Sequence, residues 1–206
     1  MQQILDAIHA LHTKWAGKPA QGIDVLPQSG SDRRYFRVHT RNGSTCIATY
    51  GNNIPENETF IYFARHFRRH GLPVPEIFAL NEEKNIYLQE DFGDLSLLNR
   101  LEAEGFTSNI YNLFRKSLHE LALLQVKGHQ EIDYSRCLTN KEFGKQAIMA
   151  DLLYFKYYFL DALRKPYDKQ KLIDDFEALS TYLTHTEYKY FMFRDFQSRN
   201  ILVRPG

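Results

Sequence analysis

The segment FMFRDFQSRNILVRPG, residues 191–206, places Asp195 five residues before Asn200, between two apolar runs that favour β structure. Two short strands around such a loop would hold both side chains at one mouth of a cleft. There a carboxylate can accept the proton of a hydroxyl group, and an amide oxygen can ligate a magnesium ion. Aspartate and asparagine are also common in Asx turns, where their side chains bond only the local backbone. The spacing alone leaves both interpretations open.

Upstream of this loop, residues 1–91 predict a small antiparallel sheet accompanied by helices. The first fifteen residues have the apolar spacing of an amphipathic helix, and the runs IDVLP, YFRVHT and TCIATY then read as strands. Asn42 and Gly43 join the last two runs and favour a type I′ hairpin, because both tolerate positive φ. A helix from about Glu56 ends at Gly71, and the runs VPEIFAL and NIYLQEDF predict two more strands.

Residues 92–206 predict a mostly helical second part. Helical periodicity covers the runs SLLNRLEAE, SNIYNLFRKSLHELALLQV, FGKQAIMADLLYFKYYFLDALRK and KQKLIDDFEALSTYL. Two further β runs, YKYFMF and NILV, flank the Asp195 loop. The expected fold class is therefore α+β.

Composition narrows the classes of partner and compartment. The 26 basic and 25 acidic residues give a net charge of +1, so no long-range field favours nucleic acid or an anionic membrane. No run approaches the roughly 20 apolar residues that span a bilayer. Cys46 and Cys137 form no CxxC pair, which favours reduced thiols. We expect a cytoplasmic protein without nucleic-acid or membrane partners.

The string FRDFQSRNIL resembles the catalytic loop of the aminoglycoside phosphotransferase and choline kinase family, relatives of the protein kinases, which reads H-x-D-x-x-x-x-N. The strings DRRYFRV from Asp32 and QEDFGD from Gln89 are similar to those of bacterial sugar kinases that phosphorylate N-acetylmuramate and N-acetylglucosamine. The likeness covers nearly the whole chain. It implies a protein-kinase-like two-lobe fold, with an antiparallel N-lobe at residues 1–91 that ends in the hinge, and a partial helical C-lobe at residues 92–206.

The same resemblance implies that ATP and Mg²⁺ are cofactors, that Asp195 is the catalytic base and that Asn200 is a magnesium ligand. It makes YLQEDFGD the hinge that meets the adenine, and QSGSDRRYF the loop over the phosphates. The nucleotide-binding residues expected on this basis are Ser29, Gly30, Ser31, Arg33, Arg34, Glu58, Glu90 and Phe92. In kinases the metal-binding DFG triplet follows the catalytic loop, whereas the DFG at residues 91–93 precedes it. Asp91 is therefore assigned to the hinge.

The chain departs from the family pattern at three places. Phe193 stands where the family usually has histidine, and the phosphate loop holds one glycine. The third-strand run TCIATYGNN contains no lysine for the α and β phosphates. Either Arg33 or Arg34 replaces that lysine, fixed by Glu58 on the following helix, or nucleotide binding is weakened. Both arginines are equally compatible with a solvated hairpin.

The family also carries a second metal-binding aspartate on the strand after NIL, and this chain stops at Gly206 before one. Because magnesium needs more than one amide ligand, we expect these 206 residues to transfer phosphate poorly or not at all. The NILV strand would present an unpaired edge, which predicts an oligomer or a disordered tail.

The expected function is an ATP- and magnesium-dependent phosphotransferase that acts on a hydroxyl of a sugar or amino sugar. Aminoglycoside, choline and fructosamine-type acceptors stay open within the resemblance. The alternative is a catalytically silent, pseudokinase-like module that binds a ligand or regulates a partner.

Two other patterns have ordinary structural interpretations. His66 and His70 have the i, i+4 spacing of metal ligands, but no third ligand is evident, and we expect a solvated helix face. The aromatic run YFKYYFL can stack on a sugar but is more often helix-packing core.

Overall fold

The computed structural model describes residues 1–28 and 32–204. The chain forms two compact units. The sheet unit comprises Met1–Ile132 and Phe193–Gly206, and the helical unit comprises Asp133–Met192. The α+β class is confirmed. The lobe boundary expected after residue 91 is a different division and stays a prediction.

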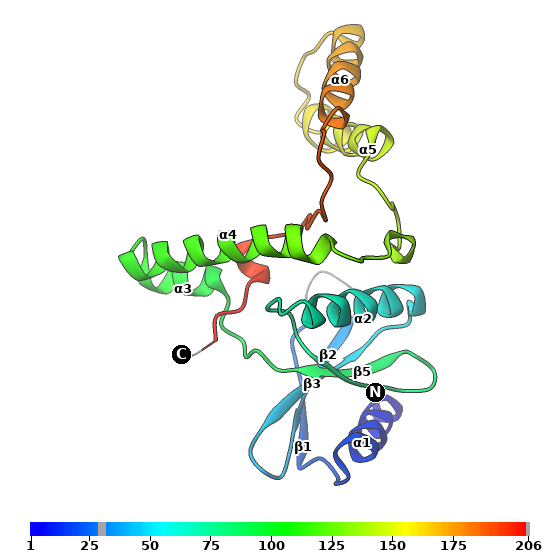
Figure 1. Ribbon diagram of the computed structural model, residues 1–206, viewed down its shortest axis with the longest axis vertical. Helices are drawn as coiled ribbons and strands as arrows, with labels where there is room; N and C mark the ends of the chain where they lie inside the picture. Colours follow the sequence, from blue (N-terminus) through cyan, green and yellow to red (C-terminus); the bar gives the residue numbers. More distant parts are fainter. Residues whose placement is uncertain (29–31, 205–206) are drawn as a thin grey trace. The chain divides into compact units, whose positions relative to one another are not determined.

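The sheet unit contains one five-stranded antiparallel sheet (Figure 1). Its strands are β1 (Gly22–Val25), β2 (Arg34–His39), β3 (Thr45–Tyr50), β4 (Ile77–Leu80) and β5 (Ile86–Glu90), in the spatial order β1-β2-β3-β5-β4. Each pair is antiparallel, and the register places Ala48 of β3 opposite both Phe36 of β2 and Leu88 of β5. The strands predicted for residues 1–91 are confirmed.

The sheet lies between two helices, α1 (Gln2–Ala16) and α2 (Ile54–Arg69) (Figure 1). Alternate residues of a strand point to opposite faces, so the buried side chains divide by parity. On one face the strands pack against Ile8 and Leu11 of α1; this core consists of Ile8, Leu11, Phe36, Val38, Cys46, Ala48, Ile86 and Leu88. On the other face, Tyr87 contacts Phe60 of α2, with ring centroids 5.4 Å apart. Both faces of the sheet are thereby covered.

The β2–β3 hairpin differs from the expected type I′ turn. Gly43 has φ 84°, whereas Asn42 is not among the residues with positive φ. The N–H of Gly43 donates to the carbonyl of Thr40 (3.2 Å), and the N–H of Thr40 donates to the carbonyl of Ser44 (2.9 Å). The loop therefore has three residues with glycine in the left-handed position, a common alternative geometry. Asn42 also accepts a hydrogen bond from the Ser44 N–H, which favours its ordinary backbone conformation.

Helix α4 (Ser108–His129) packs closely against α2. His66 is only 2% exposed and donates from Nε2 to the carbonyl of Gly128 (2.9 Å). Burial lowers the pKa of His66, so the imidazole is neutral at pH 7. The solvated face predicted for His66 is wrong, because the partner helix, which covers this face, lies about 60 residues away in the sequence.

Replacing Gly128 with alanine is expected to lower the free energy of unfolding by about 1 kcal/mol. A Cβ atom at Gly128 would lie 2.9 Å from Cε1 of Phe67, and the cost of this overpacking exceeds the gain in helix propensity. Chemical denaturation measures the change. In a Phe67→Leu background, which removes the clashing ring atoms, the same substitution should be neutral or stabilising. Equal losses in both backgrounds would contradict the close approach.

The remaining elements of the sheet unit are α3 (Leu97–Glu104) and the short 3-10 helix η3 (Ser198–Asn200). The helical unit contains η1 (Tyr134–Arg136), α5 (Lys145–Phe155), the π-helical segment η2 (Lys156–Asp161) and α6 (Lys169–Thr184). Phe176 of α6 is buried in this unit, whereas the tyrosines of the YFKYYFL run are more than half exposed. The packed core predicted for that run is therefore not observed.

The β run YKYFMF at residues 188–193 forms no strand in the described chain. A segment with high β propensity becomes a strand only when a neighbouring backbone satisfies its hydrogen bonds. This prediction was wrong because propensity does not show whether a partner strand exists.

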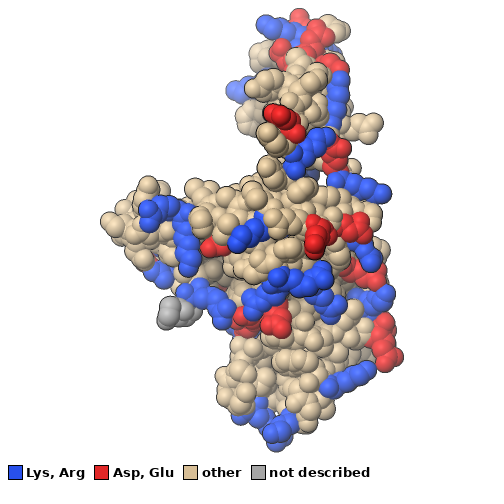
Figure 2. All heavy atoms as spheres, in the orientation of Figure 1, with Lys and Arg blue, Asp and Glu red and all other residues tan. Residues whose placement is uncertain are grey.

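Basic and acidic side chains are interspersed over the face of the molecule that Figure 2 shows. This distribution agrees with the near balance of charged residues in the sequence. None of the helices in residues 1–28 and 32–204 combines the length and apolar character needed to span a bilayer.

Candidate functional site

The loop from Asp195 to Asn200 is held by its own backbone. The N–H of Gln197 donates to the carbonyl of Asp195 (2.9 Å), and the N–H of Asn200 donates to the carbonyl of Gln197 (2.8 Å). The side-chain nitrogen of Asn200 also donates to the Asp195 carbonyl (3.0 Å). This bond orients the amide and leaves its oxygen as the remaining ligand atom. Asn200 therefore bonds the loop backbone through its nitrogen, which is not the bond of an Asx turn, and its oxygen makes no hydrogen bond within the described residues.

The carboxylate of Asp195 has a different environment. Asp195 is exposed, and no hydrogen bond or ion pair to its carboxylate occurs within the described residues. A carboxylate without a partner, on a loop that its main chain holds in place, is available to accept a proton from a bound molecule. The structure thus leaves Asp195 free for the predicted role.

The segment after this loop docks on the chain that follows the hinge. The N–H of Leu97 donates to the carbonyl of Ile201, and the N–H of Val203 donates to the carbonyl of Leu95, both at 2.8 Å. Ser96 and Leu202 form an isolated antiparallel bridge. The strand predicted for NILV is reduced to this one bridge, so the edge strand expected to drive oligomer formation is absent. The oligomer itself stays a prediction.

The two predicted hinge residues, Glu90 and Phe92, are both contacted by Arg204. Nη1 of Arg204 lies 3.0 Å from Oε1 of Glu90, and the guanidinium carbon lies 5.0 Å from the centroid of the Phe92 ring. The backbone N–H of Glu90 donates to the carbonyl of Glu76 (2.9 Å) and is not available to an adenine. Hydrogen bonds to an adenine would have to come from neighbouring backbone groups of the hinge. Sequence reasoning missed Arg204, which follows the loop at residues 195–200.

Asp91 belongs to an ion-pair network centred on Arg37 of β2. Arg37 donates from Nε to Asp91 (2.7 Å) and from Nη1 and Nη2 to Asp94 (2.7 Å each). Thr45 Oγ1 (2.7 Å) and the N–H of Gly93 (2.8 Å) also donate to the Asp91 carboxylate, whose side chain is 5% exposed. The hinge segment is thus fastened to the sheet.

The pKa of Asp91 reflects these partners. Burial alone would raise it, but the hydrogen bonds from Arg37, Thr45 and Gly93 together hold it below its ordinary value. Asp91 is therefore an ionised structural carboxylate with its oxygens in use. This geometry agrees with its assignment to the hinge.

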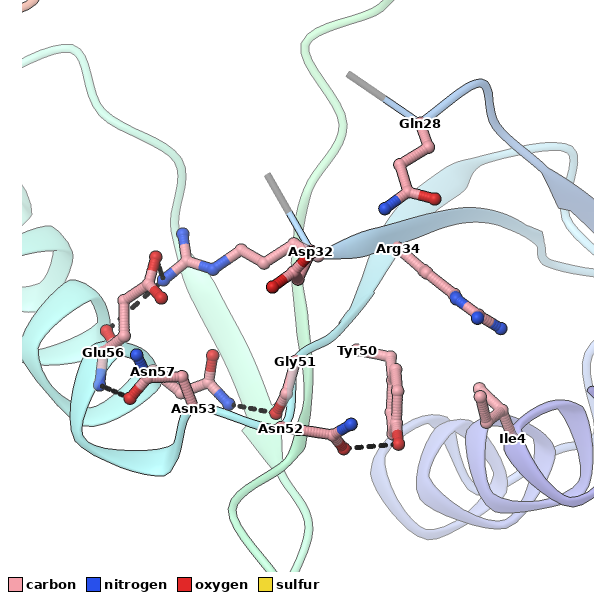
Figure 3. A pocket seen from close by; sticks show the side chains of 11 residues that line it. Ile4, Gln28, Asp32, Arg34, Tyr50, Gly51, Asn52, Asn53, Glu56 and Asn57 are labelled. Atoms are coloured by element: carbon pink, nitrogen blue, oxygen red, sulfur yellow. Dashed lines mark hydrogen bonds and ion pairs between the residues drawn. The ribbon is translucent and has the colours of Figure 1, made fainter. Parts of the chain in front are cut away.

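A cavity of about 620 Å³ lies between the start of β2, the end of β3 and the first turn of α2 (Figure 3). Most of the residues that line it are polar; the lining consists of Ile4, Gln28, Asp32, Arg33, Arg34, Tyr50, Gly51, Asn52, Asn53, Glu56 and Asn57. Both arginines predicted for nucleotide binding are in this lining. Ser29, Gly30 and Ser31, the predicted tip of the phosphate loop, lie outside the described residues, between Gln28 and Asp32.

Arg33 is held by α2 through a residue other than the predicted one. Its Nη2 lies 3.1 Å from the Glu56 carboxylate and 3.3 Å from the Glu56 carbonyl, and its guanidinium lies over Phe60 (5.4 Å). Glu58 instead forms an ion pair with Lys84. Residues 56 and 60 share a helix face at i, i+4, whereas residue 58 points elsewhere. The expectation that Glu58 fixes the arginine is therefore corrected to Glu56; nucleotide contact by Glu58 stays untested.

No group of three or more His, Cys, Asp or Glu side chains in the described residues is placed to hold a metal ion by itself. This finding does not argue against Asn200 as a ligand, because Mg²⁺ is commonly bound by one or two protein oxygens together with phosphates and water. The remaining amide oxygen of Asn200 fits that kind of site.

The sequence matches the model of a family described as the phosphotransferase enzyme family, over residues 23–206. The match begins at β1 and includes every predicted site residue. A comparison with curated proteins found no match to the chain.

Proposed function

The chain belongs to the phosphotransferase enzyme family, and from this premise we propose that it transfers the terminal phosphoryl group of ATP to a hydroxyl group of a sugar or amino sugar. The observation that carries the proposal is the loop at residues 195–200. It presents Asp195, a carboxylate without a partner among residues 1–28 and 32–204, and Asn200, an amide whose orientation is fixed by a bond to the loop backbone. The family match covers this loop.

In the proposed mechanism Asp195 orients the acceptor hydroxyl and accepts its proton as the oxygen attacks the γ-phosphorus. The bond between that phosphorus and the bridging oxygen breaks, and ADP leaves. Asn200 would hold Mg²⁺ through its amide oxygen. When bound, Mg²⁺ neutralises the charge on the phosphoryl oxygens. Most of the catalysis then comes from positioning and charge neutralisation.

Support for a sugar acceptor comes from the strings DRRYFRV and QEDFGD, which are similar to those of bacterial sugar kinases. The exposed tyrosines of the YFKYYFL run add weaker support, since aromatic faces stack on sugar rings; Tyr154 and Tyr158 lie 4.3 Å apart. Cys46 and Cys137 are free thiols, the state that the cytoplasm maintains, and we place the activity there.

A screen for ATP consumption tests the proposal. The protein is incubated with Mg²⁺ and ATP, and with N-acetylated amino sugars, aminoglycosides or choline in turn. We expect ADP release that depends on an N-acetylated amino sugar, at the low rate expected of these 206 residues. ADP release with choline and with no other acceptor would change the proposed acceptor from a sugar to an amino alcohol. Nucleotide binding without ADP release for any acceptor would support the pseudokinase alternative, which the missing third-strand lysine favours.

A further inference from the structure

We propose that the polar cavity beside α2 binds the phosphate groups of the nucleotide, and that Arg33 is the cation that anchors them in place of a third-strand lysine. This inference rests on the proposed function, because it assumes a phosphorylated donor. It goes further by assigning the phosphates to a cavity and the anchoring charge to a particular residue, directly before β2.

The third strand cannot supply the charge. Protein kinases use a lysine of this strand, held by a glutamate of the following helix. Strand β3 carries no lysine, and Thr49 near its end is fully buried. The hydroxyl of Tyr50 donates to Asn52.

Arg33 lies over the end of that strand, although in the sequence it directly precedes β2. A Cβ atom on Gly51, directly after β3, would lie 3.4 Å from Cγ of Arg33 and 2.9 Å from Oδ1 of Asn57. Glycine at this position therefore leaves room for the Asn57 amide, and the arginine side chain packs beside it. The side chain of Arg33 is 15% exposed. Its charge thus lies beside the end of β3, where the lysine of a third strand would place its own charge.

The pair of Arg33 with Glu56 corresponds to the ion pair of lysine and helix glutamate. Glu56 and the Phe60 ring hold the guanidinium from the side of α2. A guanidinium has five N–H donors in a planar fork, so it can bind a carboxylate and a phosphate together. The Nε of Arg33 is buried and has no hydrogen-bond partner in the described residues. A donor in that state calls for an acceptor from a ligand.

Asn57 provides a second polar atom that lacks a partner. It is fully buried, and its amide nitrogen donates to the carbonyls of Gly51 (2.8 Å) and Lys84 (3.0 Å), the first of which Figure 3 shows. These two bonds fix the amide, so Oδ1 cannot exchange places with the nitrogen. Oδ1 has no partner within the described chain although Asn57 lines the cavity. Arg33 and Asn57 both line the cavity, and each has one buried polar atom without a partner in the described residues. The donor of Arg33 suits a phosphate oxygen, whereas the acceptor of Asn57 suits a ribose hydroxyl or a water molecule.

The test measures binding by titration calorimetry, with ATP, adenosine and inorganic tripolyphosphate as probes. In Arg33→Gln we expect the affinity for ATP and for tripolyphosphate to fall about tenfold or more, because a hydrogen bond to a charged group is lost. Adenosine affinity should be unchanged. Arg41→Gln is the matched control: it makes the same charge change in the exposed β2–β3 hairpin, where we expect less than a twofold effect.

A folded Arg33→Gln protein that binds tripolyphosphate as tightly as the parent would overturn the inference. If Arg33→Gln fails to fold, Arg33→Lys takes its place; it keeps the charge but loses the planar fork, and several-fold weaker binding is expected. Unchanged affinity in that variant contradicts the inference too. An Arg33 variant that keeps both transfer activity and phosphate binding at the level of the parent protein would contradict only the role of Arg33. That result would leave the proposed function intact. A parent protein that binds tripolyphosphate but not ATP would count against the proposed function instead.

Discussion

The variant Asp195→Asn is expected to transfer phosphate about 10² to 10⁴ times more slowly than the parent protein, because general-base catalysis contributes factors of this size. The amide has nearly the shape of the carboxylate but cannot accept the proton of the hydroxyl. ATP affinity should stay within about twofold, since the carboxylate touches the acceptor and not the nucleotide. Rates of ADP release and calorimetric titration with ATP give the two measurements.

Asp174→Asn in α6 serves as the matched control, since it makes the same change on an exposed aspartate of the helical unit. The side chain of Asp195 makes no hydrogen bond or ion pair within the described residues, so the substitution should also leave the thermal midpoint unaltered. A rate for Asp195→Asn equal to that of the control would show that Asp195 is not the base.

Arg37→Met is expected to lower the free energy of unfolding by about 3 kcal/mol, the largest stability effect we predict. Arg37 is the shared partner of Asp91 and Asp94, and its removal leaves the Asp91 carboxylate buried with one hydroxyl and one N–H as donors. Leaving a buried charge without its ionic partner costs about 3 to 5 kcal/mol. Urea denaturation at pH 7 measures the change. Methionine keeps much of the side-chain volume, so the loss reports the charge.

The matched control is Asp94→Asn, which cuts the same network at its exposed end. The Asp94 side chain is 73% exposed, and we expect a loss of at most about 1 kcal/mol. Similar losses in the two variants would show that the network is not centred on a buried Asp91. Such a result would also remove the reason for treating the hinge as fastened to β2.

The pH dependence of stability follows from the lowered pKa of Asp91. Because the carboxylate binds its proton more weakly in the folded chain, its contribution to stability is complete above the ordinary pKa of 3.8 and is lost as the pH falls through the folded value. The difference in free energy of unfolding between the parent protein and Arg37→Met should therefore become smaller below about pH 4. Denaturation curves between pH 3 and pH 7 check this, and a difference that grows in acid would contradict the sign.

Local patterns predicted the elements of the sheet unit well. Strand β2 has apolar residues at alternate positions, β3 contains a continuous apolar run from Cys46 to Ala48, and the two strands flank a glycine turn. The apolar residues of α2 recur at helical spacing and end before Gly71. These signals lie within a few residues of one another, so the sequence contains them directly. The predicted turn type failed because loop length, and not the identity of Asn42 alone, determines the geometry.

Long-range partners were not predictable in the same way. Arg37 and Asp91 are 54 residues apart, and their contact depends on the register of the sheet, which no local pattern encodes. The choice of Glu56 over Glu58 depends on how α2 is rotated against β2. The runs YKYFMF and NILV have the composition of strands but lack the partners that strands require. Asp195 and Asn200 could be proposed from the sequence because the roles expected of them depend on spacing within one loop.

The most direct test of the account is the transfer of labelled phosphate from γ-labelled ATP to an acceptor, followed by identification of the labelled product. For the parent protein with Mg²⁺ and an N-acetylated amino sugar, we predict a labelled sugar phosphate and unlabelled ADP. Asp195→Asn should give almost no product under the same conditions. Label that stays in ATP with every acceptor, in a protein that binds ATP, would contradict the assignment of phosphoryl transfer to this chain.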